Sequence, residues 1–360
     1  MEFKQPVVEY ACPCCGAGLK FGEHVQKMTC EYCDNEFELD TVKAFCEAEK
    51  KPDEYSQWET HVDRQWSDDE ASAVRSYTCQ SCGGELITDN NTIATFCPYC
   101  DNPTILPDRS SGTLRPDAVI PFKKSREDAI TAFKEICKKK ILLPKEFLGQ
   151  HRIEKITGIY VPFWLYDCVS EFRANYRATR VRHWSDSRYH YTKTEHFLLF
   201  READAEFRSI PMDASIKMND AIMESIEPYN FDDLVDFEMS YLSGFLADRY
   251  DVESPEGHGR VRDRVAATMQ DLVSPSLLGY STVIPTTKST NIQHGNAKYV
   301  LLPVWMLHTK YKDKNYVFAM NGQTGKITGT FPVSFQKAAV WYAGLTFGIT
   351  AIGSLLAILL

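Results

Sequence analysis

The segment CPCCGAGLKFGEHVQKMTCEYC, residues 12–33, begins and ends with cysteines separated by two residues. The arrangement returns 67 positions later as CQSCGGELITDNNTIATFCPYC, residues 79–100. Each C-x2-C pair forms a tight turn that presents two thiolates to one ion, and two such turns complete a tetrahedral zinc site. The repeat therefore predicts two zinc ribbons, at 1–40 and 77–106, each with one zinc ion. The ligands are Cys12, Cys15, Cys30 and Cys33 in ribbon 1, and Cys79, Cys82, Cys97 and Cys100 in ribbon 2.

An iron centre and a disulfide cluster are the alternatives to zinc. The N-terminus lacks the basic and apolar stretches of a signal peptide, which favours the cytosol and disfavours disulfides. Zinc is the commoner occupant of four thiolates, and a site with four protein ligands is structural, because it leaves no position for water. The residues after each cysteine pair suit turns with unusual backbone angles: Gly16, Asp34-Asn35, Gly83-Gly84 and Asp101-Asn102. Cys14 is a spare thiol, and Cys46, Cys137 and Cys168 are interpreted as small core residues.

Charge is distributed unevenly along the 360 residues, whose formal net charge is −9. Residues 1–110 hold 9 Lys and Arg against 21 Asp and Glu, so the cysteine-rich part is the acidic part. A protein that follows phosphates needs clustered Lys and Arg, which disfavours nucleic acid as the partner of the ribbons. Docking of partner proteins is the preferred hypothesis, and a nucleic-acid-associated zinc-ribbon protein is the alternative.

The rest of the chain predicts an α+β fold. An acidic helical connector is expected at 41–76, and a mixed α/β cytosolic domain at 114–333. Within that domain, Ser125 is the expected N-cap of a helix. Residues 156–182 and 189–212 are typical of β-meanders, 213–227 and 255–278 of helices, and 297–333 of strands with a hairpin turn at Asn321-Gly322.

Two hexapeptides suggest an internal duplication of this domain. Tyr160-Val161-Pro162-Phe163-Trp164-Leu165 resembles Leu301-Leu302-Pro303-Val304-Trp305-Met306. Each follows an expected helix and opens a pair of strands. Two copies of a small α/β unit would explain the match, although two hexapeptides can also match by coincidence.

Residues 338–360, AAVWYAGLTFGITAIGSLLAILL, contain no charged residue. A helix of this length reaches about 34 Å, enough to cross a hydrocarbon core, so a transmembrane helix is expected here rather than a buried core helix. Lys326 and Lys337 precede it, which places the N-terminal bulk in the cytosol and the protein at the cytoplasmic membrane. Gly344 and Gly348 form the G-x3-G pattern of packed membrane helices.

Catalytic motifs are not apparent. The chain has no G-x4-G-K-[ST] phosphate-binding loop, no H-E-x-x-H and no G-x-S-x-G. The protein is therefore expected not to be an enzyme. An activity in the α/β middle region that shows no sequence motif stays open.

Several longer stretches resemble a known family. They include C79QSCGG, V119IPFKKS, I156TGIYVPFWLYD, P211MDASIKM, I226EPYNF, Y241LSGFLADRYDV, L302PVWMLHTKY and F318AMNGQTGKI. Together they resemble the YdjG-type bacterial proteins, which are membrane-anchored and carry TFIIB-type zinc ribbons. These proteins are often labelled primosomal helicase-like, a label that the missing phosphate-binding loop argues against.

The resemblance implies a membrane-stress assembly that includes a PspA-type membrane-remodelling protein and an SPFH-like companion. The sequence thus leads to the hypothesis of an adaptor that recruits these partners and that contacts the lipid bilayer through its C-terminal helix. Both homo-oligomers and hetero-oligomers are compatible with this hypothesis.

Overall fold

The computed structural model describes residues 10–22, 27–49, 56–60, 66, 74–89, 97–100, 105–108, 114–144, 147, 156–312 and 314–359. Its helices are α1 (Leu39–Glu49), α3 (Arg126–Lys138), α5 (Asp220–Ser225), α6 (Ser254–Val273) and α7 (Phe335–Leu359), with 3-10 turns η2 (Phe231–Asp233), η3 (Met239–Leu242) and η4 (Ser274–Leu277). Its strands are β1 (Lys20–Gly22), β2 (Lys27–Thr29), β3 (Glu36–Phe37), β4 (Ser56–Thr60), β5 (Val74–Cys79), β6 (Glu85–Asp89), β7 (Ile105–Asp108), β8 (Ala118–Val119), β9 (Thr157–Ser185), β10 (His190–Asp213), β11 (Val235–Asp236), β12 (Leu246–Asp248), β13 (Thr282–Tyr311), β14 (Lys314–Asn321) and β15 (Ile327–Gly329).

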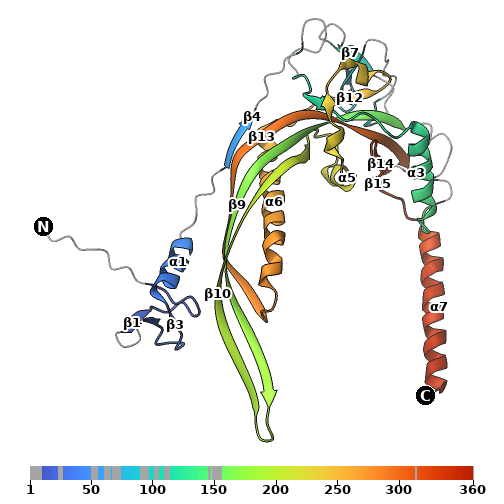
Figure 1. Ribbon diagram of the computed structural model, residues 1–360. Coiled ribbons are helices and arrows are strands. Elements are labelled where there is room, and N and C mark those ends of the chain that lie inside the picture. The colour runs from blue at the N-terminus through green and yellow to red at the C-terminus, as the bar shows by residue number, and fades with distance from the viewer. Residues whose placement is uncertain are drawn as a thin grey trace, which may run out of the picture. The chain divides into compact units, whose positions relative to one another are not determined.

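Strands dominate the described chain, so the predicted α+β class is wrong (Figure 1). One sheet has three strands in the order β1-β2-β3, and the other has twelve, with the path β11-β8-β13-β9-β12-β6-β5-β7. The reason is the length of β9, β10 and β13, which span 29, 24 and 30 residues. Residues 158–166 are buried on both faces, whereas later residues of β9 alternate between buried and more exposed positions. No strong turn signal interrupts this pattern, so the strand continues.

The sequence correctly predicted those helix ends and turns that short-range hydrogen bonds determine. Ser125 caps α3 in a capping box with Asp128, as predicted. Residues 254–277 are helical, close to the expected 255–278. The helix expected at 213–227 shrinks to α5, because the side chain of Asn219 accepts a hydrogen bond from the Ile222 N–H and so sets its beginning. The turn after Asn321 joins β14 to β15, with Gly325 in the left-handed region at φ +83°.

The chain forms two compact units. Unit 1 comprises residues 1–60, 166–210 and 258–296, and unit 2 comprises 61–165, 211–257 and 297–360. Ribbon 1 belongs to unit 1, and ribbon 2 to unit 2. The core of unit 2 includes the two matched hexapeptides, which lie on the neighbouring strands β9 and β13.

The same pattern of hydrogen bonds surrounds both hexapeptides in unit 2. Each hexapeptide begins beside a short parallel strand: Tyr160 lies opposite Ala247 of β12, and Leu301 lies opposite Val119 of β8. Five residues after each of these two partners, a backbone carbonyl accepts a hydrogen bond from the indole of the tryptophan in the hexapeptide. Trp164 Nε1 donates to the carbonyl of Val252 at 2.8 Å, and Trp305 Nε1 donates to the carbonyl of Lys124 at 2.9 Å.

The prolines of the two hexapeptides also have equivalent hydrogen-bond partners. The carbonyl of Pro162 accepts from the N–H of Ala214 at 3.0 Å, and that of Pro303 accepts from the N–H of Gly322 at 2.8 Å. The carbonyl of Ala214 accepts from Val252, and that of Gly322 accepts from Lys124. Unit 2 therefore contains two copies of one motif, the first with β8 and the start of β9, and the second with β12 and the end of β13. The short strand of each copy pairs with the long strand of the other, β8 with β13 and β12 with β9.

Within the residues that the structure describes, no helix has both the length and the apolar character needed to cross a membrane. This finding contradicts the predicted transmembrane span at 338–360 and the localisation that rested on it. Helix α7 does form, but polar residues and glycines interrupt its apolar sequence. The hydroxyl of Thr346, for example, donates to the carbonyl of Tyr342 at 2.8 Å within the helix.

Candidate metal centres

Three of the four cysteine turns are fully described, and they share one backbone geometry. The N–H groups of Gly16, Asp34 and Gly83 donate to the carbonyls of Cys12, Cys30 and Cys79 at 2.8, 2.9 and 2.8 Å. These three donors have φ angles of 80°, 54° and 69°, in the left-handed region that favours glycine and tolerates aspartate. The prediction of special turns is confirmed at these positions, while Asp101-Asn102 lies outside the described residues.

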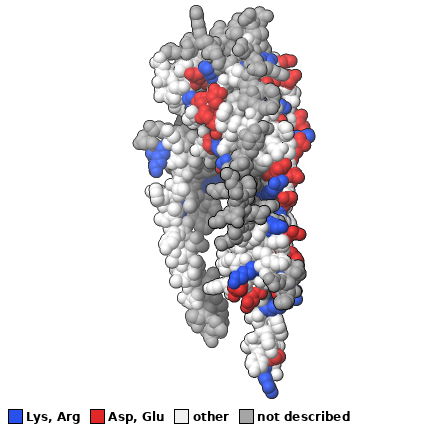
Figure 2. Space-filling model, turned by 90° about the vertical axis from the view of Figure 1, so that its left-hand side faces the viewer, with Lys and Arg blue, Asp and Glu red and all other residues white. Residues whose placement is uncertain are grey.

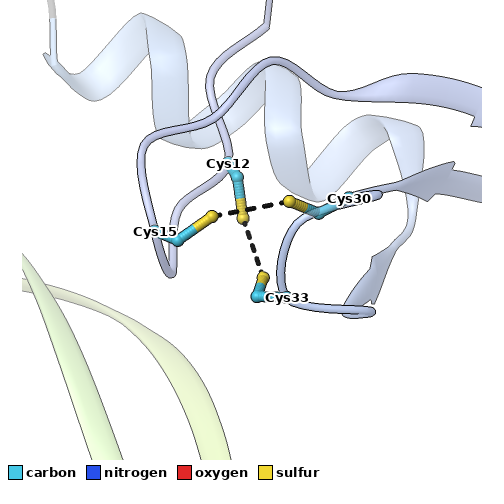
Figure 3. Close-up of side chains that lie close together, drawn as sticks. All are labelled: Cys12, Cys15, Cys30 and Cys33. Atoms are coloured by element: carbon cyan, nitrogen blue, oxygen red, sulfur yellow. Dashed lines mark hydrogen bonds between the residues drawn. The ribbon is translucent and has the colours of Figure 1, made fainter.

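The sulfur atoms of each set lie within 4.8 Å of one another, as Figure 3 shows for the four cysteines of ribbon 1. In ribbon 1, Cys12 Sγ lies 3.6 Å from Cys33 Sγ, and Cys15 Sγ lies 3.5 Å from Cys30 Sγ. In ribbon 2, the corresponding distances are 3.7 Å between Cys79 and Cys100, and 3.6 Å between Cys82 and Cys97. A zinc ion with sulfur at about 2.3 Å requires tetrahedral edges of about 3.8 Å. The eight predicted ligands thus form two groups that fit two zinc ions.

The thiols differ in how easily they ionise. Burial opposes ionisation of Cys33, but hydrogen bonds from the side chain and backbone of Asn35 lower its pKa to about 7. Cys79 is similar: burial is outweighed by the N–H groups of Cys82 and Ser81, and its pKa falls to about 7. Burial raises the pKa of Cys12 to about 12. Zinc binds thiolates, so loading of ribbon 1 must release protons from such buried thiols.

Ribbon 2 is part of the large sheet. Its strand β6 pairs antiparallel with β12, with Ile87 opposite Ala247. Cys79 and Cys97 are fully buried and belong to the same apolar cluster as the hexapeptides of unit 2. A side chain at Gly84 would come within 2.9 Å of the Tyr99 ring, so this close approach requires glycine. The second zinc site therefore lies inside the core of unit 2.

Tyr99, between Cys97 and Cys100, anchors ribbon 2 to a buried polar group. Its ring is 8% exposed, and its hydroxyl lies beside the carboxylate of Asp248 at the end of β12. Burial raises the pKa of Asp248 to about 7, against the opposing effect of the Ser215 and Tyr99 hydroxyls. Sequence reasoning missed this contact, because 149 residues separate Tyr99 from Asp248 and no local pattern connects them.

Ribbon 1 has the opposite character. Its strands form the separate three-stranded sheet. Tyr32 occupies the position that corresponds to Tyr99, between Cys30 and Cys33, yet it is 84% exposed. Phe21 of β1 is also exposed, and so are Glu31, Asp34 and Glu36, which lie near Tyr32 in the sequence. Ribbon 1 thus exposes Tyr32 to solvent, whereas ribbon 2 packs the corresponding Tyr99 into the core of unit 2.

The other predicted positions lie apart from the metal centres. Gly344 and Gly348 lie one turn apart on α7, and no atom comes within 4 Å of a Cβ added at either glycine. Cys14 is not a member of the ribbon 1 group, which agrees with the assignment of Cys12 and Cys15 as ligands. Cys137 and Cys168 are buried, as expected for core residues.

Comparison with known proteins gives one close relative. The chain is 36% identical over 342 residues, 95% of each chain, to a protein of Bacillus subtilis (strain 168) described as uncharacterized protein YdjG. No family model matches the chain. No solved structure matches it either.

Proposed function

The chain belongs to the same family as YdjG, and we propose that it is a non-enzymatic adaptor that docks a partner protein on ribbon 1. The observation that carries this proposal is the contrast between Tyr32 and Tyr99. Tyr99, between two zinc-ligand cysteines of ribbon 2, is buried against Asp248, and its counterpart Tyr32 in ribbon 1 is exposed to solvent. A side chain with an apolar ring and a polar tip is well suited to an interface.

Closed metal sites support a role without catalysis. Each zinc ion would have four cysteine ligands, which leaves no position for a substrate or an activated water. A metal ion can be held by clustered His, Cys, Asp or Glu side chains, and in the part of the chain that the structure describes the two cysteine sets form such clusters. The zinc ion of ribbon 1 would then shape a docking surface, and that of ribbon 2 would stabilise the core of unit 2.

The charge of ribbon 1 favours a partner with a basic surface. Residues 10–49 contain eight Asp and Glu against three Lys. Two of the lysines are already paired, Lys20 with Glu31 at 2.8 Å and Lys27 with Glu38 at 3.3 Å. Such a surface repels nucleic acid and guides a basic partner towards the exposed rings. PspA-type and SPFH-like proteins, which the family resemblance implies, are the first candidates.

The test is binding of a purified PspA-type or SPFH-like protein to the full zinc-loaded chain, measured by titration calorimetry. Replacement of Tyr32→Ala is expected to weaken binding at least about tenfold, the effect of losing roughly 1.4 kcal/mol at an interface. Tyr342→Ala is the matched control, because Tyr342 is an exposed tyrosine outside the ribbons, with 75% of its surface accessible. Equal affinities of Tyr32→Ala and the unaltered chain would contradict docking on ribbon 1.

A further inference from the structure

The β9–β10 hairpin ends in a two-stranded arm whose side chains are almost all exposed (Figure 1). We define the hairpin tip as residues 180–195. Hydrogen bonds fix its register: Asp186 N–H donates to the carbonyl of Tyr189 at 3.0 Å, Ser185 bonds His190 at 2.7 Å, and His183 bonds Thr192 at 2.9 Å. The residues directly opposite each other are therefore Trp184 with Tyr191, and Arg182 with Lys193. Side chains alternate across a strand, so these four residues share one face.

This face combines stacked aromatic rings with positive charge. The rings of Trp184 and Tyr191 stack with centroids 5.4 Å apart, and Trp184 remains 50% exposed. The tip contains four Lys and Arg against two Asp and Glu, and Glu195 pairs with Lys193 at 2.9 Å, so the tip keeps an excess of positive charge. Figure 2 shows a basic and an acidic side chain at its free end. Trp, Tyr and Arg are the residues that most often carry the binding energy of protein interfaces.

The turn is held rigidly in place. Asp186 accepts hydrogen bonds from the N–H groups of Arg188 and Tyr189 at 2.8 and 2.7 Å, and from the Tyr191 hydroxyl at 2.8 Å. The turn thus orders the aromatic face before any partner binds. A preorganised surface loses little conformational entropy on binding.

A second surface of the same chain is complementary in charge. Residues 219–238, which we define as the acidic edge, contain seven Asp and Glu and no Lys or Arg. Lys123 pairs with Asp233, Lys326 contacts the carbonyl of Glu227, and Arg115 donates to that of Phe237. Asp232 and Asp236 remain exposed, as does Val235 at 36%. Phe231 and Leu234 beside them are only partly buried, so apolar surface is available there for an incoming aromatic ring.

Comparison of the two copies shows that β11 lacks an outer strand among the described residues, although Trp66 packs on Phe237 beside it, with ring centroids 5.8 Å apart. Strand β11 pairs with β8, with Val235 opposite Val119. In the other copy of the motif, β6 of ribbon 2 pairs with β12 in the corresponding place, and β5 covers the outer side of β6 over five residue pairs. Among the described residues, β11 forms the end of the sheet path, without a counterpart of β5. An open strand edge is a site to which another chain can add.

We infer that the hairpin tip docks on the acidic edge of a second copy of this chain. The contact joins two different surfaces, so a pair of copies retains one free tip and one free edge, and association continues head to tail. Lys and Arg of the tip approach Asp232 and Asp236, and the aromatic pair covers Val235. This inference is independent of the partner proposed for ribbon 1.

Sedimentation velocity of the full zinc-loaded chain tests the inference. Self-association is expected at low salt and should weaken as salt rises. The variants Arg182→Glu/Lys193→Glu and Asp232→Lys/Asp236→Lys should each weaken it about tenfold or more. Arg173→Glu/Arg208→Glu is the matched control, since both arginines are exposed and paired on the same two strands away from the tip.

Mixing gives the decisive result. The two charge-reversal variants carry complementary tips and edges, so an equimolar mixture should associate although neither does so alone. Trp184→Ala should also weaken the association without changing its salt dependence. A full chain that stays monomeric at low salt would overturn the inference and identify Asp232 and Asp236 as charges that protect a strand edge. A mixture that fails to associate would overturn it as well.

Discussion

At the scale of single residues, two tyrosines at equivalent positions meet opposite environments. Tyr99 is buried against Asp248, whereas Tyr32 is exposed. The two ribbons share cysteine spacing and turn geometry, so the difference lies in what each ribbon packs against. The same zinc-ribbon scaffold can therefore serve as a core element in one place and as a docking surface in another.

The buried carboxyl of Asp248 predicts a dependence of stability on pH. An Asp carboxyl titrates near about 4 in an unfolded chain, and burial raises the pKa of Asp248 to about 7 in the folded protein. The folded state therefore binds this proton more tightly, so its contribution to stability is present at low pH and is lost as the pH rises through about 7. Asp248→Asn should be more stable than the unaltered chain at pH 8, and this advantage should be smaller at pH 6, because it declines between about pH 7 and pH 4.

Urea unfolding with excess zinc at both pH values measures this effect. Asp236→Asn is the control, because Asp236 is exposed on β11. A pH profile of Asp248→Asn that runs parallel to that of the unaltered chain would show that Asp248 does not titrate as its burial requires.

The paired indoles of the duplicated motif give a second prediction. Trp164→Phe and Trp305→Phe each remove one hydrogen bond to a backbone carbonyl, at Val252 and Lys124, while keeping most of the aromatic packing. Each change should lower the free energy of unfolding by about 1 kcal/mol, because it removes a hydrogen bond to a partly buried carbonyl. Chemical denaturation measures both. A large loss for one variant and none for the other would contradict the equivalence of the two copies.

At the scale of elements, sequence patterns predicted what local chemistry decides. The cysteine spacing identified both ligand sets, and Ser125 identified the beginning of α3. The pairing of β12 with β6 could not be predicted, because it joins residues about 160 positions apart with no shared pattern. The hexapeptides suggested a duplication, but the pairing of β12 with β9 and of β8 with β13 could not be read from them.

The C-terminal helix shows the limit of composition as evidence. A stretch without charge suggested a membrane span, and α7 does form over most of it. Whether an uncharged helix crosses a membrane depends on its mean hydropathy as well as on the absence of charge. Threonines and glycines in the described part of α7 lower its mean hydropathy. A prediction based only on the absence of charged residues does not take this into account.

At the scale of the whole molecule, charge limits the choice of partners. The net charge is −9, with the excess of acidic residues in the first 110 residues. The full zinc-loaded chain is therefore expected not to bind duplex DNA in about 50 mM salt, where a basic protein would bind strongly. Fluorescence anisotropy with a labelled duplex checks this expectation. Binding that weakens steeply with added salt would favour the nucleic-acid alternative over the adaptor.

The central claim is that the two zinc sites have different roles, one within the core of unit 2 and one on a docking module. It is tested most directly by measuring zinc content and thermal unfolding together. The unaltered chain should hold two zinc ions, while Cys12→Ser/Cys30→Ser and Cys79→Ser/Cys97→Ser should each hold one. Loss of the first site should leave the main unfolding transition nearly unchanged, and loss of the second should lower it by about 10 °C or more. Equal effects of the two losses, or a chain that folds without zinc in ribbon 2, would contradict the account.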